Sequence, residues 1–227
     1  MTLTVNELFG PTLQGEGPSI GRRCGFVRLG RCNQACVWCD EPQTWDWEHH
    51  DPAVELHEMA VDEVLAQLDA MDVDMVVITG GEPLLQQHRL ETLLRAVKDR
   101  GWRIEIETAG TIAPAMAEGL VDQWNVSPKL ENSGNPRERR YKPDVLRAFE
   151  STGRAIFKFV VCDRADLDEV QVMVGECGLT DVWVMPEGTD AVTLEKRTQD
   201  LAEEVIGRGW NLTTRLHILI WGDRRGV

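Results

Sequence analysis

Residues 25–40 read GFVRLGRCNQACVWCD, and they join a predicted β-strand to a dense cluster of cysteines. The strand is expected over 25–30, because apolar and β-branched residues dominate there. Cys32, Cys36 and Cys39 follow at once in a C-x3-C-x2-C spacing. In so short a loop three thiolates can converge on one centre, which suits a soft metal centre, either zinc or iron–sulfur.

The two metals differ in what else they need. A structural zinc requires a fourth ligand, for which Cys24, His49 and His50 are candidates. An iron–sulfur cluster held by only three cysteines leaves one iron open to another ligand. The spacing alone therefore leaves both readings open.

Outward from this loop the chain alternates short apolar runs with amphipathic segments. Helices are predicted over 58–71, 89–99, 143–152, 165–177 and 191–208. Further strands are predicted over 75–81, 103–108, 123–128, 155–161, 182–186 and 215–221. Residues 103–108 (RIEIET) alternate, with Ile104 and Ile106 on one face and Arg103, Glu105 and Glu107 on the other. This order predicts an α/β fold with a mainly parallel sheet, open or curled into a barrel.

Length and charge limit the classes of function. The 227 residues fit one domain, and 38 acidic against 24 basic side chains give a net charge of −14. Such acidity argues against tight, nonspecific binding of nucleic acid. The first residues, MTLTVNELFG, do not resemble a signal peptide, and no apolar run approaches the roughly 18 residues that span a bilayer. We therefore expect a cytoplasmic protein without a membrane segment, in which clustered cysteines hold metal.

Three short motifs each follow a predicted strand: ITGGEP (78–83), ETAG (107–110) and SPK (127–129). In a parallel sheet these positions share the edge where active sites gather. The two glycines of ITGGEP allow a ligand to approach the main chain. Each motif taken alone is equally consistent with an ordinary turn or loop.

The cysteine spacing after the first predicted strand, with Trp38 before the last cysteine, resembles the radical S-adenosylmethionine (SAM) superfamily. More narrowly, the chain resembles the 7-carboxy-7-deazaguanine synthase family. The matching pieces are LQGEG (13–17), FVRLGRC (26–32), GGEP (80–83), ETAG, VSPK (126–129) and LHILIWGDRRGV (216–227). Activases of glycyl-radical enzymes share the cysteine loop, but are not expected to carry LQGEG or SPK.

The resemblance implies an incomplete, partially open β/α radical-SAM barrel with about six mainly parallel core strands, formed by residues 1–227 as a single domain. It also implies a homodimer. The implied reaction is a lyase step in 7-deazapurine (queuosine-type) biosynthesis. A reduced 4Fe–4S cluster cleaves SAM, and the resulting 5′-deoxyadenosyl radical takes hydrogen from carbon 6 of 6-carboxy-5,6,7,8-tetrahydropterin. The ring then contracts with loss of ammonia to give 7-carboxy-7-deazaguanine.

The resemblance also assigns residues to ligands, without naming a catalytic side chain. Cys32, Cys36 and Cys39 would ligate three irons. The residues implied for SAM are Trp38, Cys39, Asp40, Gly80, Gly81, Glu82, Gly110, Ser127, Pro128 and Lys129. Those implied for the pterin are Leu13, Gln14, Gly15, Glu16, Arg28, Thr108 and His217. Arg28 suits the substrate carboxylate as a bidentate donor, and Glu16 suits the pterin amino and ring N–H groups. His217, between Leu216 and Ile218, also fits a core position.

One position departs from the family pattern. A threonine that commonly helps to hold Mg²⁺ is replaced here by Glu41, a carboxylate that is itself a good Mg²⁺ ligand. We therefore expect a magnesium site that includes Glu41, the alternative being that Glu41 faces solvent. Electrons would come from an acidic flavodoxin or ferredoxin, for which Arg22, Arg23 and Arg31 are expected to form a basic docking patch. The basic run PRERRYK (136–142) is expected to be a solvated loop.

Overall fold

The computed structural model describes residues 1–117 and 119–227. Its strands are β1 (Thr2–Leu13), β2 (Arg23–Leu29), β3 (His57–Ala60), β4 (Met75–Gly80), β5 (Arg103–Thr108), β6 (Gln123–Val126), β7 (Ala155–Val161), β8 (Val182–Pro186) and β9 (Asn211–Leu212). Its α-helices are α1 (Pro52–Glu55), α2 (Val61–Ala70), α3 (Gln87–Asp99), α4 (Arg137–Arg140), α5 (Pro143–Glu150), α6 (Asp166–Cys177), α7 (Ala191–Gly207) and α8 (Leu216–Trp221).

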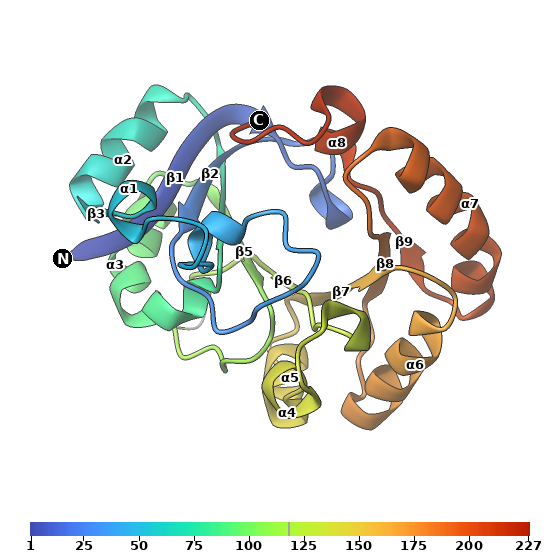
Figure 1. Ribbon diagram of the computed structural model, residues 1–227. Coiled ribbons are helices and arrows are strands. Elements are labelled where there is room, and N and C mark those ends of the chain that lie inside the picture. Colours follow the sequence, from blue (N-terminus) through green and yellow to red (C-terminus); the bar gives the residue numbers. More distant parts are fainter. Residues whose placement is uncertain (118) are drawn as a thin grey trace.

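The strands form one curved sheet in the order β3-β1-β2-β4-β5-β6-β7-β8-β9. Each neighbouring pair from β2 through β9 is parallel, whereas β1 pairs antiparallel with both β2 and β3. Figure 1 shows the larger helices on the outside of this curved sheet. Among the described residues no pairing joins β3 to β9, so the barrel is open. The expected incomplete barrel with about six mainly parallel core strands is confirmed.

The gap in the barrel is bridged by loops rather than by strands. Gly17 N donates to Thr213 Oγ1 at 2.9 Å, and Leu216 N donates to the Gly15 carbonyl at 2.8 Å. These contacts bring the segment after β1 against the start of α8. The functional consequence is that residues from both ends of the chain lie at one mouth of the barrel.

The core lies between the sheet and its outer helices. Val64, Leu65 and Leu68 of α2 are buried, as are Leu90, Leu93, Leu94 and Val97 of α3. Helical periodicity places these residues on one face of each helix, and α2 packs against β1 while α3 packs against β5 and β1. Within the described residues no helix is long and apolar enough to cross a membrane.

Four features differ from expectation, and the first is that the two-residue strand β9 was not predicted. Residues 216–221 form helix α8 rather than a strand, and only Ile218 of this helix is fully buried. A short apolar run does not by itself distinguish helix from strand. Residues 57–60 form β3 ahead of α2, because they pair with Thr2–Val5 of β1. β1 itself was not predicted; Gly10–Pro11 interrupts its apolar pattern, and its pairing with β2 shifts register there.

Candidate active site

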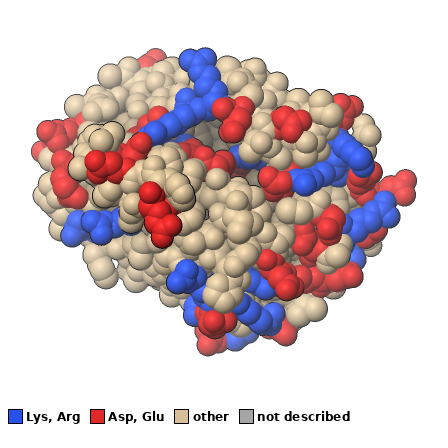
Figure 2. Space-filling model, in the orientation of Figure 1, with Lys and Arg blue, Asp and Glu red and all other residues tan. Residues whose placement is uncertain are grey.

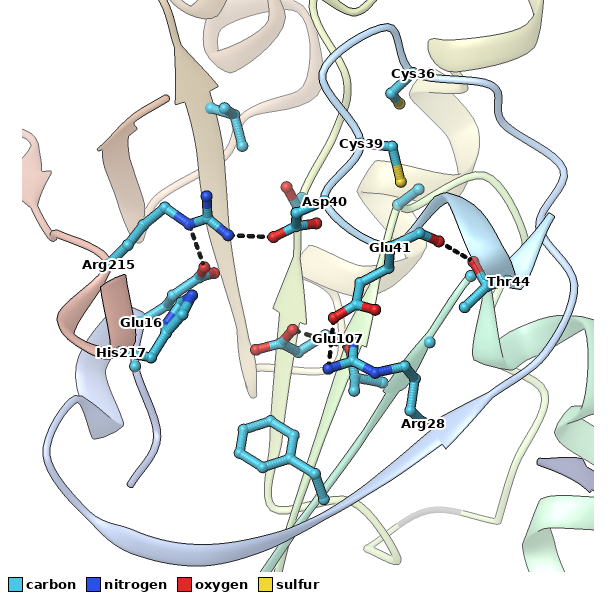
Figure 3. A pocket seen from close by; sticks show the side chains of 18 of the residues that line it. Glu16, Arg28, Cys36, Cys39, Asp40, Glu41, Thr44, Glu107, Arg215 and His217 are labelled. Atoms are coloured by element: carbon cyan, nitrogen blue, oxygen red, sulfur yellow. Dashed lines mark hydrogen bonds and ion pairs between the residues drawn. The ribbon is translucent and has the colours of Figure 1, made fainter. Parts of the chain in front are cut away.

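A cavity of about 230 Å³ opens at the carboxyl ends of the parallel strands. Figure 3 shows charged side chains from β2, the cysteine loop, β5 and the residue before α8 pointing into it. Most of the residues assigned from the sequence line it, and these are Leu13, Gln14, Gly15, Glu16, Arg28, Cys32, Cys36, Trp38, Cys39, Asp40, Glu41, Gly80, Gly81, Thr108, Ser127, Lys129 and His217. The structure therefore brings together motifs that lie up to 200 residues apart in the chain.

The cysteine loop is held at both of its ends by backbone hydrogen bonds. Arg31 N donates to the Thr44 carbonyl at 2.7 Å, and Glu82 N donates to the Arg31 carbonyl at 2.9 Å. Farther along, Ala35 N donates to Asn135 Oδ1 at 2.9 Å. The loop is thus fixed between β4 and the segment 131–140.

Each of the three cysteine sulfurs accepts an N–H hydrogen bond. The donors are the Gln34 amide for Cys32 (3.4 Å), the Asn135 side chain for Cys36 (3.3 Å) and the Trp45 indole for Cys39 (3.3 Å). Burial raises the pKa of Cys39 to about 11, so the free thiol stays protonated, and a bound metal would be needed to deprotonate it. Donors to sulfur are also what tunes an iron–sulfur cluster.

The glycines beside the loop leave room for close backbone approach. A Cβ on Gly81 would lie 2.1 Å from the Arg31 carbonyl oxygen and 2.8 Å from Cys32 Cβ. Gly80, with φ of +139°, packs as tightly against Leu29. In the loop, Gln34 Oε1 is buried without a hydrogen-bond partner among the described residues and lines the cavity. Soft donors, a glycine cradle and an unpaired acceptor fit a metal cluster with a polar ligand bound to it.

The sulfurs do not yet converge. Among the described residues there is no group of three or more His, Cys, Asp or Glu side chains already close enough to hold a metal ion. The thiols all line the cavity, and their side chains would have to turn toward one another around a cluster.

Opposite the cysteines, Glu16 is held by two cations. Its carboxylate contacts Lys158 Nζ on one oxygen and Arg215 Nε, at 3.2 Å, on the other. Burial alone would raise the pKa of Glu16, but Lys158 and Arg215 together lower it well below its usual range. Arg215 also contacts Asp40 of the cysteine loop, as Figure 3 shows. A permanently ionised carboxylate therefore faces the cavity from a rigid support.

Arg28 lies between two carboxylates. Its Nη2 is 2.7 Å from Glu41 Oε1, its Nε is 3.5 Å from Glu7 Oε2, and its guanidinium stacks 5.2 Å from the centre of the Phe9 ring. Gln43 donates to the second oxygen of Glu41. The strand β2 therefore presents one firmly oriented cation to the cavity.

Comparison with known proteins agrees with this geometry. Residues 27–150 match the family model of the Radical SAM superfamily. The chain is 37% identical to the 7-carboxy-7-deazaguanine synthase of Pyrobaculum aerophilum, over 98% of this chain and 96% of that protein. The chain belongs to the 7-carboxy-7-deazaguanine synthase family of the Radical SAM superfamily. The Halobacterium salinarum synthase is 34% identical, over 97% of this chain and 91% of that one. The crystal structure of QueE from Escherichia coli has a TM-score of 0.72 at 26% identity and 95% coverage of both chains.

Three residues expected to contact SAM do not line the cavity. Glu82 is fully buried, and its carboxylate accepts hydrogen bonds from Leu84 N, Thr108 Oγ1 and Ala109 N at 2.8–3.0 Å. It ties the end of β4 to the end of β5. Gly110 packs against Val126 and Leu146, and Pro128 lies outside the cavity lining.

Two charged residues that line the cavity, Lys158 and Arg215, were not singled out from the sequence. Glu107 also lines it, and it begins the ETAG motif. Lys158 had a visible signal, since it is the only charged residue within the buried apolar strand β7. Arg215 had no such signal, because its role depends on the position of α8.

The expected basic docking patch does not form. Arg22 and Arg23 lie at the start of β2, whereas Arg31 follows its end. A seven-residue strand separates these points by about 20 Å. By contrast, the basic run 136–142 contacts the cysteine loop, because the Gln34 side chain donates to the Arg139 carbonyl at 3.1 Å. Its Arg140 is buried against Glu169 rather than solvated.

Proposed function

We propose that the chain catalyses the reaction for which its family is named, forming 7-carboxy-7-deazaguanine from 6-carboxy-5,6,7,8-tetrahydropterin with loss of ammonia. The observation that carries the proposal is the shared cavity. The cysteine loop, Gly80, Gly81, Glu16 and Arg28 all line it. A cofactor and a small polar, anionic substrate can therefore meet in one cavity.

Cys32, Cys36 and Cys39 would hold a 4Fe–4S cluster, which together with SAM supplies radical chemistry when bound. Residues around the loop are suited to the rest of SAM. Lys129 Nζ lies 5.9 Å from the centre of the Trp38 ring and donates to Ser127 Oγ at 3.0 Å. Gly80 and Gly81 line the cavity, and their lack of side chains lets the end of β2 and the start of the cysteine loop pack directly against them.

The remaining residues bind and orient the substrate. Ionised Glu16 would accept hydrogen bonds from the pterin amino and ring N–H groups, with Lys158 and Arg215 fixing its position. Arg28 would pair with the substrate carboxylate. His217 lies against Gly15, where a Cβ would come within 2.0 Å of His217 Nδ1. Burial lowers the pKa of His217, so that a neutral imidazole would face the pterin.

Magnesium does not fit this arrangement. The carboxylate expected to bind it, Glu41, pairs with Arg28 on one oxygen and with Gln43 on the other. Arg28 already supplies the positive charge that a cation would bring to this carboxylate. The proposed reaction is therefore written without a magnesium step.

The proposal extends to assembly and partners. Residues 1–227 would form a single domain, since one sheet includes strands from Thr2 to Leu212. The enzyme would work as a cytoplasmic homodimer and receive electrons from a flavodoxin or ferredoxin. It would not bind nucleic acid; on the face shown in Figure 2, basic side chains are interspersed with acidic ones. Light scattering of the purified protein tests the dimer.

A rival function is a binding protein with a structural zinc at the cysteine loop. Anaerobic reconstitution with iron and sulfide, followed by metal analysis and EPR of the reduced protein, separates the two. The enzyme should contain about four irons per chain and give a cluster signal. One zinc and no iron would contradict the proposal.

A second rival is an activase that acts on another protein. SAM cleavage by the reconstituted, reduced enzyme should then be measured with and without the carboxylated pterin. Coupled turnover with the pterin alone is expected, because the cavity suits a small molecule. Cleavage that responds only to an added protein would favour the activase.

A further inference from the structure

The segment Gly222–Val227 returns from α8 to the mouth of the cavity. Gly222, with φ of +71°, ends the helix, and Arg224, Gly226 and Val227 line the cavity. Figure 1 shows this red segment crossing toward the blue strands β1 and β2. No part of the reaction described above uses it.

Arg225 fastens the segment to two distant elements. Its Nη1 lies 3.1 Å from Glu55 Oε2 of α1, its Nη2 lies 3.3 Å from Asn6 Oδ1, and its Nε lies 3.5 Å from Glu7 Oε1. Asn6 also donates to the Glu55 carbonyl at 2.8 Å, so the acceptors of Arg225 are themselves held together.

Glu7 lies between Arg225 of this segment and Arg28 of the proposed substrate site. One of its oxygens faces Arg225 and the other faces Arg28, each at 3.5 Å. Both distances exceed those of a good charge-assisted hydrogen bond, so Glu7 is fully engaged with neither arginine. Arg28 has its shorter contact, 2.7 Å, with Glu41.

A substrate carboxylate at Arg28 would change this balance. Arg28 and Arg225 face Glu7, Glu41 and Glu55, so the group carries one excess negative charge before any ligand binds. A further carboxylate beside Arg28 repels Glu7 and replaces it as a partner. Arg225 is then the cation with which Glu7 can pair.

We propose that Arg225 is a positioning residue. When the substrate carboxylate pairs with Arg28, Glu7 pairs with Arg225 instead, and this ion pair closes the segment 222–227 over the bound pterin. Closure keeps Arg224 at the cavity mouth and retains the bound pterin. This inference rests on the proposed pterin substrate.

Hydrogen exchange of the cluster-loaded, unreduced enzyme with SAM tests the closure without turnover. The probes are the carboxylated tetrahydropterin and the same pterin without its carboxylate. Only the carboxylated compound should slow exchange in residues 222–227, by about tenfold. Equal protection by both compounds, or by neither, would overturn the inference.

Variants test the role of Arg225 in the same assay. Arg225→Gln should abolish the carboxylate-dependent protection and raise the KM for the pterin by about tenfold, with kcat changed by less than about twofold. Arg225→Lys should restore part of both effects. The control is Arg95→Gln, which removes an exposed ion pair on α3. An Arg225→Gln variant indistinguishable from this control would refute the role.

The two proposals fail in distinguishable ways. An enzyme that makes the deazaguanine product without carboxylate-dependent protection keeps the proposed function and loses the closure. An enzyme that neither binds nor converts the pterin loses both.

Discussion

Arg215 and Glu16 lie 199 residues apart in the chain, yet Arg215 Nε is 3.2 Å from Glu16 Oε1 inside the barrel. The same guanidinium contacts Asp40 beside the cysteines and donates to the Gly188 carbonyl at 2.8 Å. One buried arginine thus joins the cofactor wall of the cavity to its substrate wall, and it does so across the gap where the barrel is not closed by strands.

Removal of Arg215 should cost much more stability than removal of an exposed arginine. Arg215→Met leaves the buried carboxylate of Glu16 with one cation fewer, and we expect a loss of about 3 kcal/mol in the free energy of unfolding. The control Arg100→Met breaks an exposed pair with Asp69 and should cost less than about 1 kcal/mol. Urea unfolding of the two variants measures both values. Equal losses would show that the Arg215 contacts are not structural.

Glu41 should make the enzyme insensitive to magnesium. Because Arg28 neutralises Glu41, kcat/KM is expected to change by less than about twofold between excess EDTA and added Mg²⁺. Glu41→Thr introduces the residue that the family resemblance leads us to expect here and removes this carboxylate, so that activity should then respond to Mg²⁺. Glu48→Thr, an exposed change in the same loop, serves as the control. A wild-type enzyme that loses most of its activity in EDTA would contradict the Arg28–Glu41 interpretation.

Gly81 should be required for cluster assembly. A Cβ there would press on the Arg31 carbonyl and on Cys32, so Gly81→Ala should displace the cysteine loop and lower the iron content well below four per chain. The matched control is Gly175→Ala in α6, where a Cβ meets nothing within 4 Å. Iron and sulfide analysis after identical reconstitution compares them, and full iron content in Gly81→Ala would refute the steric argument.

His217 should make the fold less stable in mild acid. Burial lowers the pKa of His217, and Arg215 adds to this effect, although Glu16, Asp40 and Glu107 oppose it. Below pH 6.5 the unfolded chain therefore binds a proton at this histidine more readily than the folded chain, and stability falls as pH falls.

His217→Gln should thus lose less stability between pH 7.5 and pH 5.5 than the wild type does. His49→Gln is the control, and its effect on the pH dependence should have the opposite sign. The hydrogen bond of His49 to Asp46 raises the pKa of His49, so this variant should lose more stability than the wild type over the same pH range. Urea unfolding at the two pH values gives the comparison. An unchanged pH dependence in His217→Gln would mean that this imidazole is not buried as described.

Strands β4 to β8 were predictable because each is a short run of mainly apolar residues, or in β5 of isoleucines alternating with charged residues, that follows an amphipathic helix or a loop. The cavity-lining motifs were predictable because they follow these strands. β3 and β9 were not, since their short strands are defined by pairing with β1 and β8 rather than by local pattern.

Charge partners were the least predictable part of the site. Arg28 and Glu41 were both expected to bind ligands, and nothing in the sequence indicated that they bind each other. The partners of Glu82 were equally unpredictable, because Thr108 and Ala109 belong to the next strand and loop; its expected contact with SAM stays a prediction. Such pairings depend on the curvature of the whole sheet.

Conversion of a carboxylated pterin to a deazaguanine in the cavity can be measured by anaerobic incubation of the reconstituted enzyme with SAM, a reductant and 6-carboxy-5,6,7,8-tetrahydropterin, with mass detection of the product. We expect 7-carboxy-7-deazaguanine and ammonia in a one-to-one ratio, with no protein substrate present. SAM cleavage that leaves the pterin unchanged would contradict this expectation.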